Sequence, residues 1–408
     1  MGEHGPSRRE FLEAASTAAV ASLLWRGCDP DFGASGDSPP INASPIPEEQ
    51  RTRMPADAYE DRRVVRVHDQ RATGYSFGET ENAALEVRAD VVLEMLEAGI
   101  AQMARTTSSR GAWAALLPGD LATARVAVKV NMNGDEPHFL NTSPAMVVAL
   151  AQSLVAAGVS AENILFFDRS RRFHEVYREA IDAAVPGLAL LGADEVETDP
   201  AAVITAGSML LGDGRPVSVP APRALVEADH LINVHLLKGH FGGSTGSMKN
   251  LFGLARDVWG TFHGRSDLGL VTYEKGRQCA DLALDPIVRS KSRLLVAEGV
   301  YGTFWHANKP PDRFRNQDLF PGGLPCSLVL GRNPLHHDMV LFDLLREERN
   351  YAPLDDGYDF YPDGWLQACA RDPYRLGVFE HGRVVDGRFT AKDLAYEFID
   401  YVSFATGR

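Results

Sequence analysis

The segment Lys238-Gly-His-Phe-Gly-Gly-Ser-Thr-Gly-Ser-Met-Lys249 connects an apolar run at residues 231–237 to a second apolar run at residues 251–255. It contains two lysines, one histidine, three hydroxyl side chains and four glycines. The first run has the length and composition of a buried strand, and the second is typical of a helix. A glycine-bearing turn between a strand and a helix directs backbone N–H groups and cationic side chains toward one point. The segment therefore predicts a strand–turn–helix unit with a site for an anion or a polarised carbonyl group.

The alternation of strands and helices continues on both sides of this segment. Strands are predicted at residues 125–130, 163–167, 231–237, 293–297 and 326–330, with a hairpin at residues 210–219 around Asp213-Gly214. Helices are predicted at residues 91–103, 144–157, 173–184, 280–288, 334–345 and 391–404, and after Gly246. This pattern indicates an α/β fold with a mainly parallel sheet and helices on both faces, built as one domain or as two coupled α/β subdomains. In such sheets, ligands bind outside the carboxyl ends of the strands.

Capping residues mark both ends of one predicted helix. Thr142 or Ser143 precedes the helix at residues 144–157 as its expected N-cap. Gly158 follows the same helix as its expected C-cap. These signals set the ends of this helix more firmly than its hydrophobic pattern does.

Composition limits the classes of partner. The chain has 408 residues, of which 45% are hydrophobic and 24% charged, so it can bury one large core or two coupled cores. Its net charge of −14 argues against a nucleic-acid partner and against an anionic membrane surface. The four cysteines, Cys28, Cys279, Cys326 and Cys369, form no CxxC pair, which excludes a standard iron–sulfur or zinc-ribbon spacing. Buried free thiols are expected, while the spacing leaves a Cys279–Cys326 or a Cys326–Cys369 disulfide open.

The N-terminus carries an export pattern. The residues Ser7-Arg-Arg-Glu-Phe-Leu12 match the twin-arginine motif S-R-R-x-F-L, and a weakly apolar run, Ala14–Leu24, follows. This run suits a signal peptide and is too short for a bilayer, which needs roughly 20 residues. We expect a signal peptide at residues 1–35, a disordered Pro- and Ser-rich linker at residues 36–60 and the α/β domain at residues 61–408. The alternative is an amphipathic N-terminal helix with a chance arginine pair.

This pattern also predicts where the protein is found. We expect the twin-arginine translocase as a partner during export, a periplasmic or extracellular location and no stable membrane span. Proteins that use this route cross the membrane folded, and many of them acquire a cofactor first.

Polar residues follow two of the predicted strands directly. Lys129 and Asn131 end the strand at residues 125–130, and Asp168 ends the strand at residues 163–167. A lysine within a run of valines must reach solvent or meet an acid, so Lys129 is a candidate for a ligand contact or for a structural ion pair. Asn131 is a candidate substrate contact, and Asp168 is a candidate for binding a hydroxyl group or a metal ion, or for a solvated turn.

The opening segment concentrates the candidate catalytic residues. Lys238 and Lys249 would hold or polarise an oxyanion, and His240 would act as a general acid or base. Thr245 and Asn250 are candidate substrate contacts. We expect Thr245 or the serine before it to cap the helix after Gly246, whose positive dipole end would add to the two lysines. The spacing of a phosphate-binding P-loop is not met, so nucleotide hydrolysis is not predicted.

A third group of residues has metal-ligand chemistry. His336, His337 and Asp338 are adjacent, but at most one of the histidines is expected to point to the same place as Asp338. Asp281 and His263 are the other candidate ligands for a divalent metal ion. His235, alone on the polar face of its strand with Asn233, is expected to be a core histidine.

The order of these elements resembles a large bacterial and archaeal family, domain-of-unknown-function family 362. In that family one strand ends in Lys-x-Asn and a later strand ends in Asp, as at Lys129-Val-Asn131 and Asp168. The central family signature is Lys-Thr-His followed by Thr-Gly-x-x-Lys-Asn. It is matched here by Lys238-Gly-His240 and by Thr245-Gly-Ser-Met-Lys-Asn250.

Further elements of the resemblance are an Asp-Leu pair at Asp281-Leu282, a strand before Gly299 and a helix start at Pro334–Asp338. The resemblance extends over about residues 125–345 and implies an α/β fold and a site at the signature. Two residues depart from the family pattern, because Gly239 replaces a threonine and Glu298 replaces an aspartate. Many relatives also carry a ferredoxin-type cysteine cluster that this chain lacks, so no iron–sulfur cluster is expected.

Together these features favour an exported enzyme that acts on a small anionic or carbonyl-bearing molecule, with or without a divalent metal ion. A first alternative is an exported protein that binds an anion or a metal ion without chemistry. A second alternative is a buried structural network of Lys, His and Asn side chains, whose disruption would lower stability.

Overall fold

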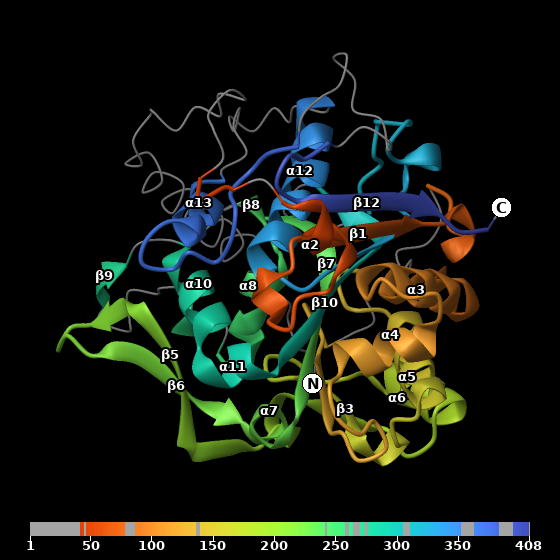
Figure 1. Ribbon diagram of the computed structural model, residues 1–408. Helices are drawn as coiled ribbons and strands as arrows, with labels where there is room; N and C mark the ends of the chain where they lie inside the picture. Colours follow the sequence, from red (N-terminus) through yellow and green to blue (C-terminus); the bar gives the residue numbers. More distant parts are fainter. Residues whose placement is uncertain are drawn as a thin grey trace, which may run out of the picture. The chain divides into compact units, whose positions relative to one another are not determined.

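A central mixed sheet organises the part of the chain that the computed structural model describes, which is residues 41–44, 46–77, 86–135, 139–240, 243–257, 261–263, 270–273, 276–304, 311–351, 363–382 and 395–407. Eight of its strands follow the order β12-β1-β11-β10-β7-β2-β3-β4, and β8 pairs with β7 only (Figure 1). The strands are β1 (Arg63–His68), β2 (Val126–Lys129), β3 (Ile164–Asp168), β4 (Ala189–Gly192), β7 (His230–His240), β8 (Gly243–Ser244), β10 (Ser292–Thr303), β11 (Ser327–Gly331) and β12 (Asp400–Ala405). The predicted α/β class is confirmed.

The sheet is mainly parallel. Of the eight strands in the main order, only β11 runs against its neighbours, β1 and β10. The strands β10, β7, β2, β3 and β4 are parallel and adjacent, so their carboxyl ends meet at one edge. In this block, Lys129 of β2 is the register partner of Phe167 in β3 and of Asn233 in β7. The polar residues that follow these strands are thereby brought to the same end of the sheet.

Helices cover both faces of the sheet, as predicted. One apolar layer packs alternate residues such as Val128 and Val234 against α3 (Ala89–Met103), α4 (Ser109–Leu116), α5 (Pro144–Ala157) and α6 (Glu175–Ala184). The opposite layer contains α7 (Arg223–Glu227), α8 (Ser247–Asn250), α10 (Arg277–Leu284), α11 (Pro286–Lys291), α12 (Pro334–Tyr351) and α13 (Gly364–Ala370). Short 3₁₀ turns are η1 (Ala58–Glu60), η2 (Gln70–Ala72), η4 (Ala161–Asn163), η5 (Ala193–Glu195), η6 (Leu251–Leu254) and η8 (Pro321–Gly323). The two groups of helices lie on different sides of the sheet in Figure 1.

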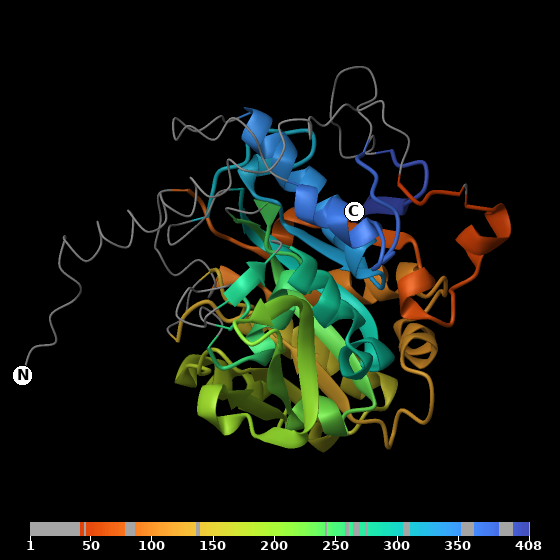
Figure 2. The ribbon, with the colours of Figure 1, turned by 90° about the vertical axis from the view of Figure 1, so that its left-hand side faces the viewer.

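A second, antiparallel sheet is formed around the predicted hairpin. Strands β5 (Thr198–Leu211) and β6 (Pro216–Pro222) pair with each other, and β9 (Leu270–Tyr273) pairs with β5. Gly214 lies in the turn with φ 80°, which fits the Asp213-Gly214 signal. The hairpin is at the left of Figure 1 and faces the viewer in Figure 2. Residues 39–408, which include both sheets, form one compact unit.

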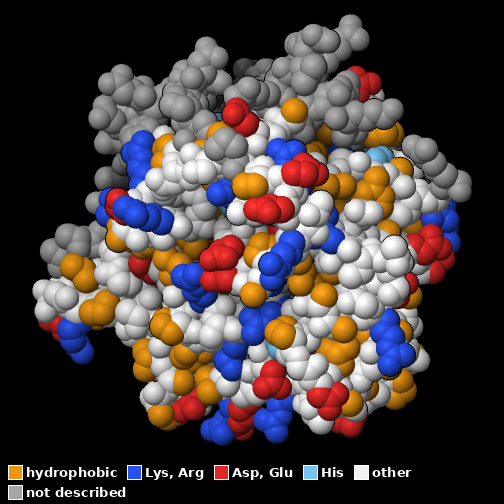
Figure 3. Space-filling view, in the orientation of Figure 1, with side chains coloured by type: hydrophobic (Ala, Val, Ile, Leu, Met, Phe, Trp, Pro, Cys, Tyr) orange, Lys and Arg blue, Asp and Glu red, His pale blue; other side chains and the backbone are white. Residues whose placement is uncertain are grey.

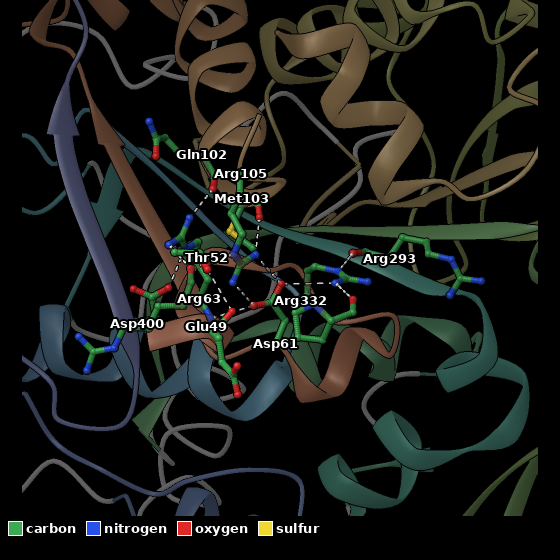
Figure 4. A network of polar contacts seen from close by, with 12 residues as sticks. Glu49, Thr52, Asp61, Arg63, Gln102, Met103, Arg105, Arg293, Arg332 and Asp400 are labelled. Atoms are coloured by element: carbon green, nitrogen blue, oxygen red, sulfur yellow. Dashed lines mark hydrogen bonds and ion pairs between the residues drawn. The ribbon is translucent and has the colours of Figure 1, made fainter. Parts of the chain in front are cut away.

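The folded part begins before β1. Helix α2 (Glu48–Thr52) and the turn η1 lie within residues 36–60, which the sequence analysis assigns to the linker. Tyr59 is buried, and the carboxylate of Asp61, which is 1% exposed, accepts from Arg105 at 2.9 Å and from Arg332 at 3.3 Å (Figure 4). Arg332 also donates to the carbonyl of Pro55 at 2.7 Å. These contacts attach the segment before Val64 to the domain.

The helix at residues 144–157 has the predicted bounds and caps. Ser143 accepts from the backbone N–H of Met146, and Gly158 follows in the left-handed conformation. The helix predicted at residues 280–288 is divided at Pro286 into α10 and α11, because proline cannot donate within a helix. The helix predicted at residues 391–404 is wrong over its described part, residues 395–404, because residues 395–399 are not helical and β12 begins at Asp400 and pairs with β1.

Further predictions concerned the cysteines, the N-terminal export pattern and the absence of a membrane span. Cys279, Cys326 and Cys369 are buried free thiols, as predicted, and burial raises the pKa of Cys279 and Cys326 to about 12. The twin-arginine motif, the apolar run Ala14–Leu24 and Cys28 lie outside the described residues. None of the described helices has both the length and the hydropathy required to cross a bilayer. On the face shown in Figure 3, positive and negative side chains are intermixed.

Replacing Gly158 with alanine should lower the free energy of unfolding by about 1 kcal/mol. A Cβ atom at this position meets open space, so the cost comes from the backbone, which has φ +114°. Denaturation in urea measures the change.

Gly364→Ala is the matched control. Its Cβ atom also meets nothing within 4 Å, but Gly364 does not have a positive φ and begins helix α13. This substitution should be neutral or slightly stabilising, because alanine favours the helix. Equal destabilisation of both variants would contradict the assignment of strain to Gly158.

Candidate functional site

The carboxyl ends of β2, β3 and β7 bring most of the predicted site residues together. Lys129 ends β2, Asp168 ends β3, and Lys238 lies near the end of β7. Asn131 follows β2, and Asn250 ends the short helix α8 that follows β7. Their side chains belong to two networks, one closed and one centred on Lys238.

The closed network is an ion pair. Lys129 donates to Asp168 at 2.9 Å and to the carbonyl of Val130 at 2.6 Å, and both charged side chains are almost fully buried. The remaining acceptor capacity of Asp168 is used by the N–H of Met132 at 3.1 Å and by Ser170. A Cβ atom at Gly253 would lie 2.6 Å from the Lys129 ammonium, so η6 packs directly over the pair. This geometry fits the structural alternative for Lys129 and Asp168.

Lys238 has no such acid partner. Its ammonium, on a side chain that is 7% exposed, contacts the amide oxygens of Asn131 at 3.2 Å and Asn133 at 3.3 Å. No carboxylate among the described residues forms an ion pair with it. Burial, together with the positive charge of Lys249, lowers the pKa of Lys238 to about 7. Lys238 is therefore a poorly solvated cation held in place by neutral groups.

An asparagine network fixes these amide groups. Asn250 donates to Asn233 at 2.7 Å and to the carbonyl of Val234 at 3.0 Å. Its own side-chain oxygen accepts from Asn131 at 2.8 Å. Because Asn131 donates to Asn250, its oxygen is directed to Lys238. Asn250 thus orients the group that holds the lysine.

The start of helix α8 is capped from a distant part of the chain. The carboxylate of Asp338, at 0% exposure, accepts from the N–H of Ser247 at 2.6 Å and from that of Met248 at 3.1 Å. A Cβ atom at Gly246 would overlap this carboxylate, which explains the glycine in the signature. The predicted cap at Ser244 or Thr245 is therefore wrong, and the first N–H groups of α8 are not free for a ligand.

Lys249 lies apart from the amide network. It is partly buried, its ammonium is 3.2 Å from Nε2 of His263, and it lies over the ring of Phe252. Burial lowers the pKa of Lys249 to about 8. A lysine and a histidine in contact share a hydrogen bond most easily when at least one of them is neutral.

Two predicted residues of the opening segment have contrasting positions. The N–H of Thr245 donates to the carbonyl of Lys238 at 2.7 Å, while its buried hydroxyl group has no hydrogen-bond partner. The hydroxyl groups of Ser244 and Ser247 are also buried without partners. The backbone of His240 pairs with Gly243, and its side chain lies outside the described part of the structure.

The three predicted metal ligands lie in different places. Asp281 accepts from the backbone and hydroxyl group of Ser208 in β5, and His263 contacts Lys249. Asp338 instead groups with His235 and His337, whose ligand atoms all lie within 4.8 Å of one another. Neither Asp281 nor His263 belongs to this group. His336 is directed elsewhere, because its Nε2 accepts from the N–H of Val378 at 2.8 Å.

Sequence reasoning missed two residues of the site. Asn133 contacts Lys238, and its position two residues after Asn131 is a signal that alternation along the chain could have provided. Glu298 is buried on β10, accepts from the N–H of Ser143 at 2.9 Å, and its pKa is raised to about 7 by burial. No pattern in the sequence distinguishes a buried glutamate of this kind.

A separate cavity of about 800 Å³ lies beside the segment before β1. It is lined by arginines, but Arg63 pairs with Asp400 at 2.8 Å and Arg105 pairs with Asp61. Two of the lining arginines are therefore already neutralised by carboxylates.

Comparison with known families identifies the central region. Residues 126–310 match the family model described as Domain of unknown function (DUF362). This range contains Lys129, Asp168, the whole opening segment and Glu298, but not Asp338. A comparison with curated proteins finds no match. The match is confined to residues 126–310, and the chemistry has to be argued from the site itself.

Replacing Lys129 with methionine should lower the free energy of unfolding by about 3–5 kcal/mol, because Asp168 is left as an uncompensated buried charge. Urea denaturation monitored by circular dichroism measures the effect. Arg88→Met is the control, since Arg88 and Asp90 form an exposed pair at 2.7 Å with side chains 52% and 65% exposed. That substitution should cost less than about 1 kcal/mol. A similar small cost for Lys129→Met would argue against a structural ion pair.

Proposed function

We propose that this protein is an exported enzyme that acts on a small anionic or carbonyl-bearing substrate, which the Lys238 ammonium binds at the carboxyl edge of the sheet. The observation that carries this proposal is the buried lysine, which two amide oxygens hold without an acid partner in the described part of the chain. A cation that is poorly solvated and unpaired gains most when an anion takes the missing position.

The surrounding residues support the same chemistry. Asn131 and Asn133 hold the ammonium in place before a ligand arrives, and Asn250 orients Asn131, so little reorganisation is needed on binding. Lys249 adds a second cation, and Thr245 offers a buried hydroxyl group without a partner. We assign His240 as the general acid or base, because imidazole is the side chain most easily tuned near neutral pH.

Export is the second part of the proposal. It rests on the twin-arginine pattern at Ser7–Leu12 and on the apolar run that follows it. The protein would reach the periplasm or the extracellular space after transport by the twin-arginine translocase. Fractionation of cells that carry the wild-type chain or an Arg8→Lys, Arg9→Lys variant tests this location.

Removal of one cation from the site should nearly abolish turnover. Lys238→Met and Lys249→Ala are each expected to lower kcat/KM by about 100- to 1,000-fold, because each removes a donor to the developing oxyanion. The assay incubates the protein with a mixture of small carboxylic and phosphorylated acids and follows their depletion by mass spectrometry. His240→Ala should have a comparable effect if the imidazole transfers a proton.

Lys291→Met is the matched control. Lys291 donates to the backbone carbonyls of Val226 and Ala228 next to the amino end of β10, away from the proposed site. It should keep full turnover per folded molecule. Unchanged turnover in both Lys249→Ala and His240→Ala would contradict the assignment.

The competing function is an exported binding protein that holds an anion without chemistry. In this alternative Lys238 also binds the anion, but the ligand would be recovered unchanged after equilibrium binding. Binding that depends on Lys238, with no depletion of any acid in the mixture, would favour this alternative.

Anion binding should weaken as pH rises through about 7. The pKa of Lys238 is about 7, so the ammonium group that attracts the anion loses its proton above this pH. A bound anion in turn favours the protonated form of the lysine. For sulfate, whose charge is constant in this range, the apparent Kd should rise by up to about 50-fold between pH 7 and pH 9. Isothermal titration calorimetry measures it.

The Lys238→Arg variant provides the comparison. A guanidinium group stays charged throughout this range, so the loss of sulfate binding caused by deprotonation at position 238 should disappear. An apparent Kd for the wild-type protein that changes less than about threefold would show that the Lys238 charge does not bind the anion.

A further inference from the structure

We propose that His235, His337 and Asp338 bind one divalent transition-metal ion in the layer between β7 and α12. The three residues come from the middle of β7 and from the first turn of α12. Their ligand atoms lie within 4.8 Å of one another, and all three side chains are fully buried. This site is distinct from Lys238 and does not depend on the proposed enzymatic function.

The hydrogen bonds of His337 determine which of its nitrogens is available. Nε2 lies 3.1 Å from the carbonyl oxygen of Val329, which can only accept, so Nε2 carries the hydrogen. In a neutral ring, Nδ1 then presents a lone pair. This lone pair faces the Oδ1 atom of Asp338 at 3.2 Å. Two acceptors at this distance repel each other unless a positive species lies between them.

A proton between His337 and Asp338 would explain the contact between these two residues but not the position of His235. Protonated Nδ1 of His337 could donate to Asp338, but His235 would remain unexplained. Among the described residues, neither buried ring nitrogen of His235 has a hydrogen-bond partner of normal geometry, although the backbone of Asn233 lies near enough to interact with the ring. The ring packs edge-on against that of His337 with centroids 4.9 Å apart. An unmade hydrogen bond of this kind is costly in a buried site. A metal ion accounts for the lone pairs of both histidines and for the carboxylate at once.

The spacing fits coordination. With ligand bonds of about 2.1 Å, the 3.2 Å separation of Nδ1 and Oδ1 corresponds to an angle of roughly 100° at the ion. This value lies between the angles of tetrahedral and octahedral geometry. The bond from Nε2 of His337 to the Val329 carbonyl is the outer contact that usually orients a metal-binding histidine. The N–H groups of Ser247 and Met248 orient the Asp338 carboxylate in the same way.

The ligand set selects a class of metal. Two imidazoles and one carboxylate suit Zn²⁺, Fe²⁺ and similar first-row ions, whereas Mg²⁺ and Ca²⁺ prefer ligand sets made of oxygen atoms. Asp338 contributes one negative charge, so the occupied site would carry a net charge of about +1.

Metal content of the full-length protein tests the proposal directly. After expression with added Zn²⁺ and Fe²⁺ and passage through metal-free buffer, elemental analysis should find about one transition-metal ion per chain. Replacing the native ion with Co²⁺ should give visible d–d absorption typical of nitrogen and oxygen ligands. Adding Zn²⁺ to metal-stripped protein should raise Tm by at least a few degrees.

His235→Leu should lower the affinity for Zn²⁺ by more than the roughly 10- to 100-fold loss that follows removal of an outer partner. His336→Gln is the matched control from the same turn of α12, because His336 is directed to Val378 and glutamine keeps an acceptor. It should retain the metal ion and the Co²⁺ absorption. Lys238→Met should also retain them, which separates this proposal from the anion site.

Two outcomes would overturn the inference. One is folded wild-type protein without bound metal that shows neither a Tm shift with Zn²⁺ nor d–d absorption with Co²⁺. That result would assign a proton to the His337–Asp338 contact instead. The other is a His235→Leu variant that binds Zn²⁺ as tightly as the wild-type protein. The wild-type measurements decide the question even if a variant fails to fold.

Discussion

The hydrogen bonds from Ser247 and Met248 to the Asp338 carboxylate are the interaction on which the site depends. They join the helix of the signature segment to α12, which lies about 90 residues further along the chain. This contact positions α8, and α8 presents Asn250 to Asn131, whose amide oxygen in turn faces Lys238. The geometry around the buried ammonium is therefore set by a carboxylate that never touches it. The same carboxylate faces His337, so the proposed anion site and the proposed metal site share one structural support.

The two buried lysines at the carboxyl edge of the sheet have different kinds of partner. Lys129 meets Asp168 within a closed set of hydrogen bonds, and η6 packs over the pair. Lys238, on a neighbouring strand, meets only amide oxygens among the residues that the structure describes. A buried ion pair contributes little net stability, whereas a buried unpaired cation costs stability and is retained where function requires it. This contrast is the physical basis for proposing Lys238, rather than Lys129, as a functional residue.

Local signals in the sequence were sufficient for much of the fold. The helix ending at Gly158 was predicted to the residue because its caps are adjacent in sequence, and strands of valine and leucine were recognised from their apolar runs. Features set by distant contacts were not predicted. Strand β12 has a helix-like pattern, but it pairs with β1 more than 300 residues earlier, and the cap of α8 comes from Asp338. The sequence placed Lys238 and Asn250 together, while the grouping of His235 with Asp338 required the packing of α12 on the sheet.

The pairing of β1 with β12 also has a consequence for how the protein is made. Residues 63–68 leave the ribosome early, but the neighbour that completes their hydrogen bonds is residues 400–405. Its other neighbour, β11, is also synthesised late, so β1 has both edges unpaired throughout most of translation, a feature that favours association with other unfolded chains. The main sheet is complete only after nearly the whole polypeptide has been synthesised. A transport system that translocates folded proteins would suit this order of assembly better than one that translocates the unfolded chain during synthesis.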